Sequence, residues 1–442
     1  MINKLKNKLD GDVHLKELLT GSAITFVLKF IGIILSYFVL YLISKKNGPE
    51  GVGIYNLFNQ SLLVISTILS FGLNISVLRY VGQFNDNENK HKIHQLNSHL
   101  IKYIVPSTLV VGLLLFLFAN FISAKMGEPK GYITIIQLLA LALPFFTLNQ
   151  IYVEFIRGLK KLHISELVRS VIRPIIIVIV MFAFWNKDLN NYELIIIVVL
   201  GILINFAISI STVWRYLKMI PKNISTNFSS KEISKTSIPM MITSVSNSLR
   251  IAIPLFVLNH YYSEKIVGYY SVTFSLTQII SFIIIILNSI GAPKYSELYW
   301  QNKKNELKIL IRQSAKILFW AGLFCSIMLF LLKDYILGLF GVDYINFQTT
   351  IVLSILLLAQ FVNTASGSVG ILLNMSGHQT VFRKINLIGL IVTVLISMIL
   401  IPFTDMVGAA IAFAIGSICI NVVSSLYVKK KIDITTFYIP IK

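Results

Sequence analysis

Long apolar runs are the feature that most constrains this chain. Stretches such as Ile31–Ile43, Val352–Phe361 and Leu387–Ile401 contain no charged residue. Only 13% of the 442 residues are charged and 55% are hydrophobic, whereas soluble domains carry about 25% charged residues. A hydrocarbon core about 30 Å thick requires about 20 residues of helix, and backbone polar groups inside lipid must be paired within the segment. The sequence therefore predicts an all-α membrane protein.

The apolar runs divide the chain into about twelve transmembrane helices, which places both termini on one side of the membrane. The predicted spans cover residues 19–43, 54–77, 101–123, 132–155, 170–185, 194–214, 237–258, 266–290, 313–332, 348–373, 385–401 and 407–428.

Basic residues are unevenly distributed between alternate loops. Of the 39 Lys and Arg, 29 lie on the side of the termini, seven lie in the opposite loops, and Lys29, Arg250 and Lys316 lie inside spans. Because the basic excess marks the cytoplasmic side, we expect a multi-pass protein of the cytoplasmic membrane with both termini cytoplasmic. This topology accounts for the net charge of +20, so the expected partners include membrane lipids and no nucleic acid.

A faint internal repeat relates the two halves of the chain. Val52–Tyr55 and Val267–Tyr270 share a Val-Gly-aromatic or aliphatic-Tyr pattern at an offset of 215 residues, and two further glycine pairs follow at an offset of 219. Gly and Tyr are common at helix ends, so chance is the alternative. Duplicated bundles are typical of transporters, and we expect residues 1–220 and 221–442 to form two six-helix lobes around a central cavity.

Two basic residues, Lys29 and Arg250, lie near the middle of the first span of each half, 221 residues apart. A charge at this depth is costly unless it meets a partner or a wet cavity. Only Glu154 among the 19 Asp and Glu falls within a predicted span, so we expect both cations to bind substrate phosphate in a cavity. The alternative is that they snorkel or pair with helix carbonyls.

Other polar residues form a second group of candidates. Asn247 shares a span with Arg250, and the remaining members lie near the ends of spans, where anchoring to anionic lipid is the main alternative to substrate binding. This group comprises Arg79, Asn247, Arg157, Arg173 and Lys316.

Signals for enzymatic chemistry are weak. His91, His94 and His99 lie in or near a charged loop without a cysteine partner, which argues against a metal site. The chain has no Walker A sequence. We expect no catalytic residues, no metal and no cofactor.

Several short motifs resemble the multidrug/oligosaccharidyl-lipid/polysaccharide exporter superfamily, and within it the Wzx-type polysaccharide flippases. They are Gly48–Tyr55, Phe71–Leu73 followed by Arg79–Tyr80, Leu373–His378, Leu400–Pro402 and Val407–Ala412. Their order and spacing extend over essentially the whole chain.

The resemblance implies alternating access that moves an undecaprenyl-pyrophosphate-linked oligosaccharide from the inner to the outer leaflet, for O-antigen, capsule or another surface glycan. It also implies coupling to H⁺ or Na⁺ and polysaccharide assembly partners as candidates. Relatives of this kind often carry basic residues in the first and seventh helices, where Lys29 and Arg250 lie. Two alternatives remain open, an ion-coupled small-molecule antiporter and a membrane-embedded glycosyltransferase or polymerase.

Overall fold

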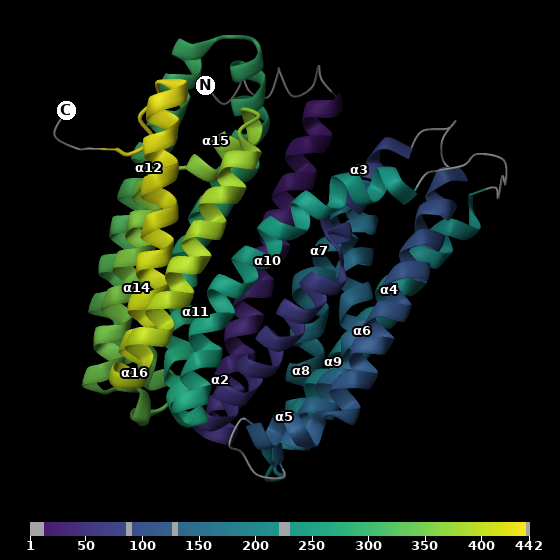
Figure 1. Cartoon of the computed structure of the whole chain (residues 1–442), viewed down its shortest axis with the longest axis vertical. Helices are drawn as coiled ribbons and strands as arrows, with labels where there is room; N and C mark the ends of the chain where they lie inside the picture. Colours follow the sequence, from purple (N-terminus) through teal and green to yellow (C-terminus); the bar gives the residue numbers. More distant parts are fainter. Residues whose placement is uncertain (1–12, 85–90, 126–130, 221–229, 439–442) are drawn as a thin grey trace. The chain divides into compact units, whose positions relative to one another are not determined.

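A computed structural model describes residues 13–84, 91–125, 131–220 and 230–438. The start of the predicted cytoplasmic tail and the loops at 85–90, 126–130 and 221–229 lie outside these ranges. Within them every regular element is a helix (Figure 1). The predicted all-α class is therefore confirmed.

Nine helices of the described residues are long and apolar enough to cross a membrane. Two of these candidates, Ile24–Leu69 and Gln379–Ile432, have 46 and 54 residues, enough for two crossings each at about 20 residues per crossing. The contiguous elements α7 (Leu162–Glu166), η1 (Leu167–Val171) and α8 (Ile172–Ala183) supply one more. The described helices thus account for twelve crossings in a multi-pass membrane protein.

A single non-helical residue divides each of the two longest helices. In α2 (Val13–Leu69) it is Gly48, with φ 66°, followed by Pro49. In α16 (Gln379–Ile432) it is Asp405, with φ 47°, three residues after Pro402. Glycine tolerates a left-handed φ and proline lacks the N–H that a continuing helix would use, so both chain reversals are local.

The predicted span 348–373 is divided in the structure. Helix α14 (Phe347–Ala365) ends before Gly367, which adopts φ 72°, and a separate short helix, α15 (Val369–Met375), follows. An apolar run gives no indication of a break at a single glycine, because hydropathy reports burial and not backbone direction.

The helices form two compact units. Unit 1 contains the described residues up to Leu42 and from Ile65 to Met241. Its main core joins α3, α4, α6 and α9 around Tyr152 and Phe155. Besides part of α2, its helices are α3 (Leu73–Phe84), α4 (His91–Leu117), α5 (Ala119–Lys125), α6 (Gly131–Gly158), α7, η1, α8, α9 (Asn191–Lys218) and the start of α10 (Ser230–Tyr261).

Unit 2 contains Ile43–Val64 and the described residues from Ile242 onward. Helix α14 packs against α11, α12 and α16 at its centre. Besides part of α2 and most of α10, the elements of unit 2 are α11 (Glu264–Trp300), α12 (Lys304–Leu331), α13 (Lys333–Phe340), η2 (Val342–Tyr344), α14, α15 and α16.

The two repeat motifs of the sequence contact each other inside unit 2. A Cβ placed on Gly53 would lie 2.2 Å from the carbonyl oxygen of Glu264, and one placed on Gly268 would meet the carbonyl oxygen of Pro49. Each glycine therefore abuts the residue four positions before the other glycine. Such a reciprocal contact is the signature of a local twofold relationship, which agrees with the offset of 215 residues.

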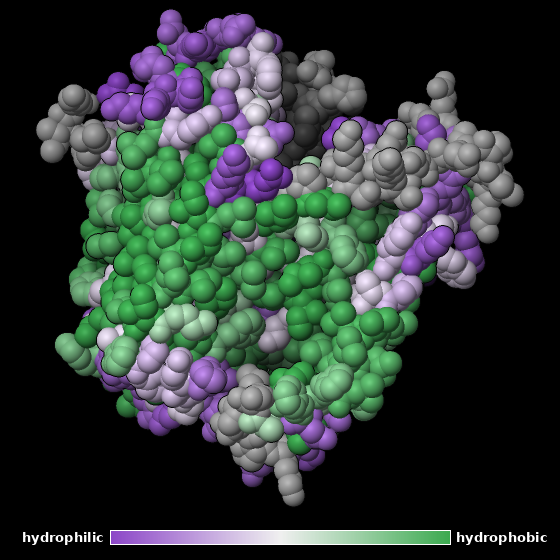
Figure 2. Space-filling model, in the orientation of Figure 1, coloured by the Kyte–Doolittle hydropathy of each residue, from purple (hydrophilic) through white to green (hydrophobic). Residues whose placement is uncertain are grey.

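Exposed apolar side chains follow the helical period on the outside of unit 2. On α16 they include Ile388, Ile391, Leu395 and Ile399, all at least half exposed. Over the helices of unit 2, hydrophobic side chains cover the middle and hydrophilic ones gather toward the two ends (Figure 2). An apolar stripe that faces outward is expected of a helix in contact with lipid.

Candidate substrate-binding site

Arg250 on α10 contacts neutral groups of unit 2. Its Nη1 donates to Ser417 Oγ, its Nη2 donates to Asn247 Oδ1 at 2.9 Å, and its guanidinium lies 5.0 Å from the centre of the Phe413 ring. None of the ion pairs found among the described residues includes Arg250. Desolvating a cation without a counter-charge is costly, so this position calls for an anion.

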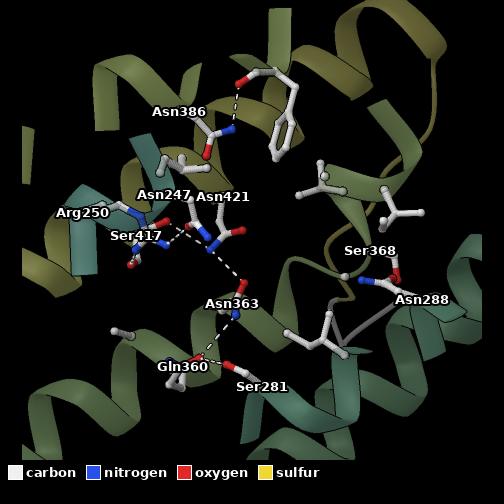
Figure 3. A pocket seen from close by; sticks show the side chains of 18 of the residues that line it. Asn247, Arg250, Ser281, Asn288, Gln360, Asn363, Ser368, Asn386, Ser417 and Asn421 are labelled. Atoms are coloured by element: carbon white, nitrogen blue, oxygen red, sulfur yellow. Dashed lines mark hydrogen bonds between the residues drawn. The ribbon is translucent and has the colours of Figure 1, made fainter. Parts of the chain in front are cut away.

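The same side chain lines a pocket of about 390 Å³ that lies entirely in unit 2 (Figure 3). Five helices converge on it: α10, α11, α14, α15 and α16. Its polar lining consists of one cation, eight amides and three hydroxyls: Arg250, Asn247, Gln278, Asn288, Gln360, Asn363, Asn374, Asn386, Asn421, Ser281, Ser368 and Ser417. No carboxylate lines this pocket.

Hydrogen bonds connect some of these amides into a chain across the pocket wall. Ser281 Oγ donates to Gln360 Oε1 at 2.8 Å, and Asn363 Nδ2 donates to the same oxygen at 3.3 Å. Asn421 Nδ2 in turn donates to Asn363 Oδ1 at 3.2 Å. The chain links α11, α14 and α16 and fixes which amide atoms remain free for other contacts.

Four buried polar atoms of the lining have no hydrogen-bond partner among the described residues. They are Arg250 Nε, Gln278 Nε2, Asn288 Oδ1 and Ser368 Oγ. Buried polar groups in folded proteins are rarely left unpaired. Two nitrogen donors, an amide oxygen and a hydroxyl around one cavity therefore suit a ligand that both donates and accepts hydrogen bonds.

Lys29 lies half-buried on α2 in unit 1, beside a carboxylate that the sequence analysis missed. A Cβ placed on Gly32, one turn after Lys29, would lie 2.5 Å from Ser170 Cβ, so α2 closely approaches η1. Ser170 Oγ donates to Glu166 Oε1 at 2.8 Å. Of the charged groups around Lys29, Glu166 attracts it most strongly. The expectation that Glu154 is the only carboxylate within a span is corrected here, because the helix begins at Leu162 and not near residue 170.

Of the second group of candidates, Arg157 lies in a small ion-pair network of unit 1. Arg169 Nη2 donates to Glu154 Oε1 at 2.6 Å, Arg157 Nη1 lies 3.7 Å from Glu154 Oε2, and Arg169 Nε lies 4.0 Å from Glu166 Oε2. Glu166 is buried and Arg157 remains largely exposed. This network surrounds Lys29 with charges of both signs.

The remaining candidates lie apart from the pocket of unit 2, except Asn247, which is hydrogen-bonded to Arg250. The guanidinium of Arg173 lies 5.7 Å from the centre of the Phe146 ring. Arg79 on α3 and Lys316 on α12 are exposed.

Sequence analysis did not single out Ser417, Asn421 or Asn386, although all three line the pocket. A usable signal was the spacing of Ser417 and Asn421, which are four residues apart and therefore share a helix face. Gln360 and Asn363 follow the same rule at a spacing of three.

Comparison with known proteins adds a family to this geometry. The sequence pattern of the family described as polysaccharide biosynthesis protein matches residues 18–297, and that of the MatE family matches residues 239–399. The chain is 25% identical to the capsular polysaccharide biosynthesis protein CapF of Staphylococcus aureus, over 92% of this chain and 98% of that protein. It is 22% identical to a putative O-antigen transporter of Shigella flexneri, over 84% and 88% of the two chains.

Solved structures of similar fold include a multidrug resistance MATE family transporter of the MOP superfamily in its inward-facing conformation, with a TM-score of 0.75, 14% identity and coverage of 92% of this chain and 98% of the other. The lipid II flippase MurJ in its inward closed conformation gives 0.73 at 15% identity, with coverage of 93% and 87%. These matches confirm the resemblance to the exporter superfamily. The activities that their names state are transport and lipid flipping, not an enzymatic reaction.

Proposed function

Because the chain belongs to the polysaccharide biosynthesis protein family, we propose that it is a flippase for an undecaprenyl-pyrophosphate-linked oligosaccharide. In this proposal it moves the lipid from the inner to the outer leaflet of the cytoplasmic membrane by alternating access, with both termini cytoplasmic. The observation that carries the proposal is the Arg250 guanidinium, which lines a pocket of unit 2 and has only neutral hydrogen-bond partners among the described residues.

Phosphate matches the chemistry of this position. A guanidinium presents donors in a planar fork that fits phosphate oxygens, and charge-assisted hydrogen bonds are about twice as strong as neutral ones. Arg250 Nε has no partner in the described part of the chain and is available to such an oxygen. Lys29, the corresponding cation of unit 1, is proposed as the second phosphate contact.

The lipid part of the substrate requires only apolar surface. Unit 1 offers a groove of about 700 Å³ between α4, α6 and α9, lined almost entirely by apolar side chains such as Leu109, Leu113, Phe116 and Leu141. These four side chains are about half exposed. An isoprenoid chain can lie along such a groove while the charged headgroup occupies polar space.

Alternating access requires two bodies that move relative to one another, and the repeat supports this requirement. The reciprocal contact of Gly53 and Gly268 is expected of a duplicated bundle, in which each copy supplies one half of the transport path.

The test is surface glycan in a strain without the wild-type copy, with the membrane level of each variant measured in parallel. Arg250→Ala and Lys29→Ala should each lower glycan output roughly ten- to hundredfold, the value of one or two charged hydrogen bonds. Arg250→Lys should retain part of the output, because it keeps the charge but not the fork. Lys308→Ala, which removes an exposed lysine of α12, is the matched control. Normal glycan from the Arg250→Ala, Lys29→Ala double variant would refute the proposal.

A further inference from the structure

We infer that the pocket of unit 2 is a glycosyl subsite, which holds one neutral sugar residue with hydroxyl or acetamido groups next to a phosphate bound by Arg250. The inference rests on the proposed function for the phosphate. It adds the chemical class of the sugar and the residues that recognise it.

The lining is rich in amides and poor in charge. Each Asn or Gln offers a carbonyl acceptor and an amino group with two donors, which is the combination that sugar hydroxyl and acetamido groups require. Arg250 is the single ionisable residue of the lining, and no carboxylate accompanies it. A sugar that carries a second negative charge would therefore be desolvated without a partner, and burying an unpaired charge is costly.

The unpaired atoms separate this pocket from ordinary interhelical packing. Polar side chains in membrane helices often bond to one another, and the chain from Ser281 through Gln360 to Asn363 is of that kind. Gln278 Nε2, Asn288 Oδ1 and Ser368 Oγ are buried and have no partner among the described residues. Packing alone would leave their desolvation uncompensated.

The positions of these groups fit a ligand that bridges the pocket. Figure 3 shows Arg250 with Ser417 on one side, Ser368 and Asn288 on the opposite side, and Asn363 between them. A phosphate at Arg250 therefore leaves the attached sugar beside the unpaired amide and hydroxyl groups. The volume of about 390 Å³ lies at the lower end of the range of about 300–1,000 Å³ for ligand pockets, which suits one sugar residue and not a whole repeat unit.

The experiment uses the full-length protein in nanodiscs and three probes: inorganic phosphate, N-acetylglucosamine 1-phosphate and glucuronic acid 1-phosphate. Ser368→Ala and Gln278→Met each remove an atom that has no protein partner in the described structure. Both variants should therefore keep or raise the melting temperature of the unliganded protein. Ser397→Ala is the matched control, because it removes a buried, unpaired hydroxyl of α16 outside the pocket.

The wild-type protein should bind N-acetylglucosamine 1-phosphate about tenfold more tightly than either other probe. Ser368→Ala and Gln278→Met should each lose about fivefold of that affinity and leave phosphate binding unchanged, and Ser397→Ala should change neither. Phosphate binding without a preference for the acetamido sugar overturns the glycosyl subsite and leaves the proposed function standing. Equal affinity for the uronic acid overturns its neutrality. Failure of the wild-type protein to bind any of the three overturns the phosphate role of Arg250 and the subsite together.

Discussion

The contact between Gly53 and Gly268 yields the sharpest stability prediction. A methyl group at Gly53 would lie 2.2 Å from the Glu264 carbonyl oxygen, against at least 3.4 Å for an ordinary contact. The Gly268 position is tighter, because its Cβ would meet the Pro49 carbonyl oxygen and no flexible side chain intervenes. Alanine at either position therefore forces the end of α11 and the second segment of α2 apart by about 1 Å or more.

The cost can be estimated from two opposing contributions. Overpacking a tight contact typically costs about 1–3 kcal/mol, and alanine regains about 1 kcal/mol of helix propensity over glycine. We expect a net loss of about 1–2 kcal/mol for Gly268→Ala, and a similar or smaller loss for Gly53→Ala. The double variant should lose less than the sum of the two, because one separation of the helices relieves both contacts.

The assay is thermal unfolding of the purified full-length protein, with Gly82→Ala as the matched control. Gly82 lies within α3 and has no atom within 4 Å of its Cβ position, so its replacement should leave the melting temperature unchanged or raise it. Melting of Gly53→Ala and Gly268→Ala at or above the temperature of the Gly82→Ala protein would refute the close approach and the local twofold relationship inferred from it.

Two further predictions follow from charge. Glu166→Gln removes the strongest attraction on Lys29, so binding of inorganic phosphate should strengthen severalfold at low salt and the gain should shrink as salt screens the charges; an unchanged affinity at low salt would exclude competition between Glu166 and phosphate. Reporter domains inserted after Lys187 and Lys265 should both be extracytoplasmic because the basic excess lies in the alternate loops, and a cytoplasmic signal from either would contradict the assigned topology.

The helical class and the number of crossings could be predicted because each depends on apolar length alone. The runs that end at Ile43 and Ile401 are long enough to identify spans without any knowledge of packing. The division of the predicted span 348–373 could not be predicted, because Gly367 turns the backbone through φ 72° within a stretch that remains apolar on both sides.

The candidate site was only partly predictable. Arg250 and Asn247 were identified because a charge and a nearby amide inside an apolar run are conspicuous. Ser417 and Asn421 were not, since one serine or asparagine in a span is explained equally well by bonding between helices. Their role emerges only when α16 is brought beside α10 and α14, a relationship that no local pattern encodes.

The two cations that the sequence treats as equivalent have different surroundings. Lys29 lies beside Glu166, which is itself held by Ser170, and a network of Arg157, Arg169 and Glu154 surrounds it. Arg250 is held by neutral groups alone among the described residues. An anion that reaches Lys29 has to compete with a resident carboxylate, whereas an anion that reaches Arg250 supplies the counter-charge that this position lacks. Substitution of Arg250 should therefore weaken phosphate binding more than substitution of Lys29, even though the two residues occupy corresponding helices of the repeat.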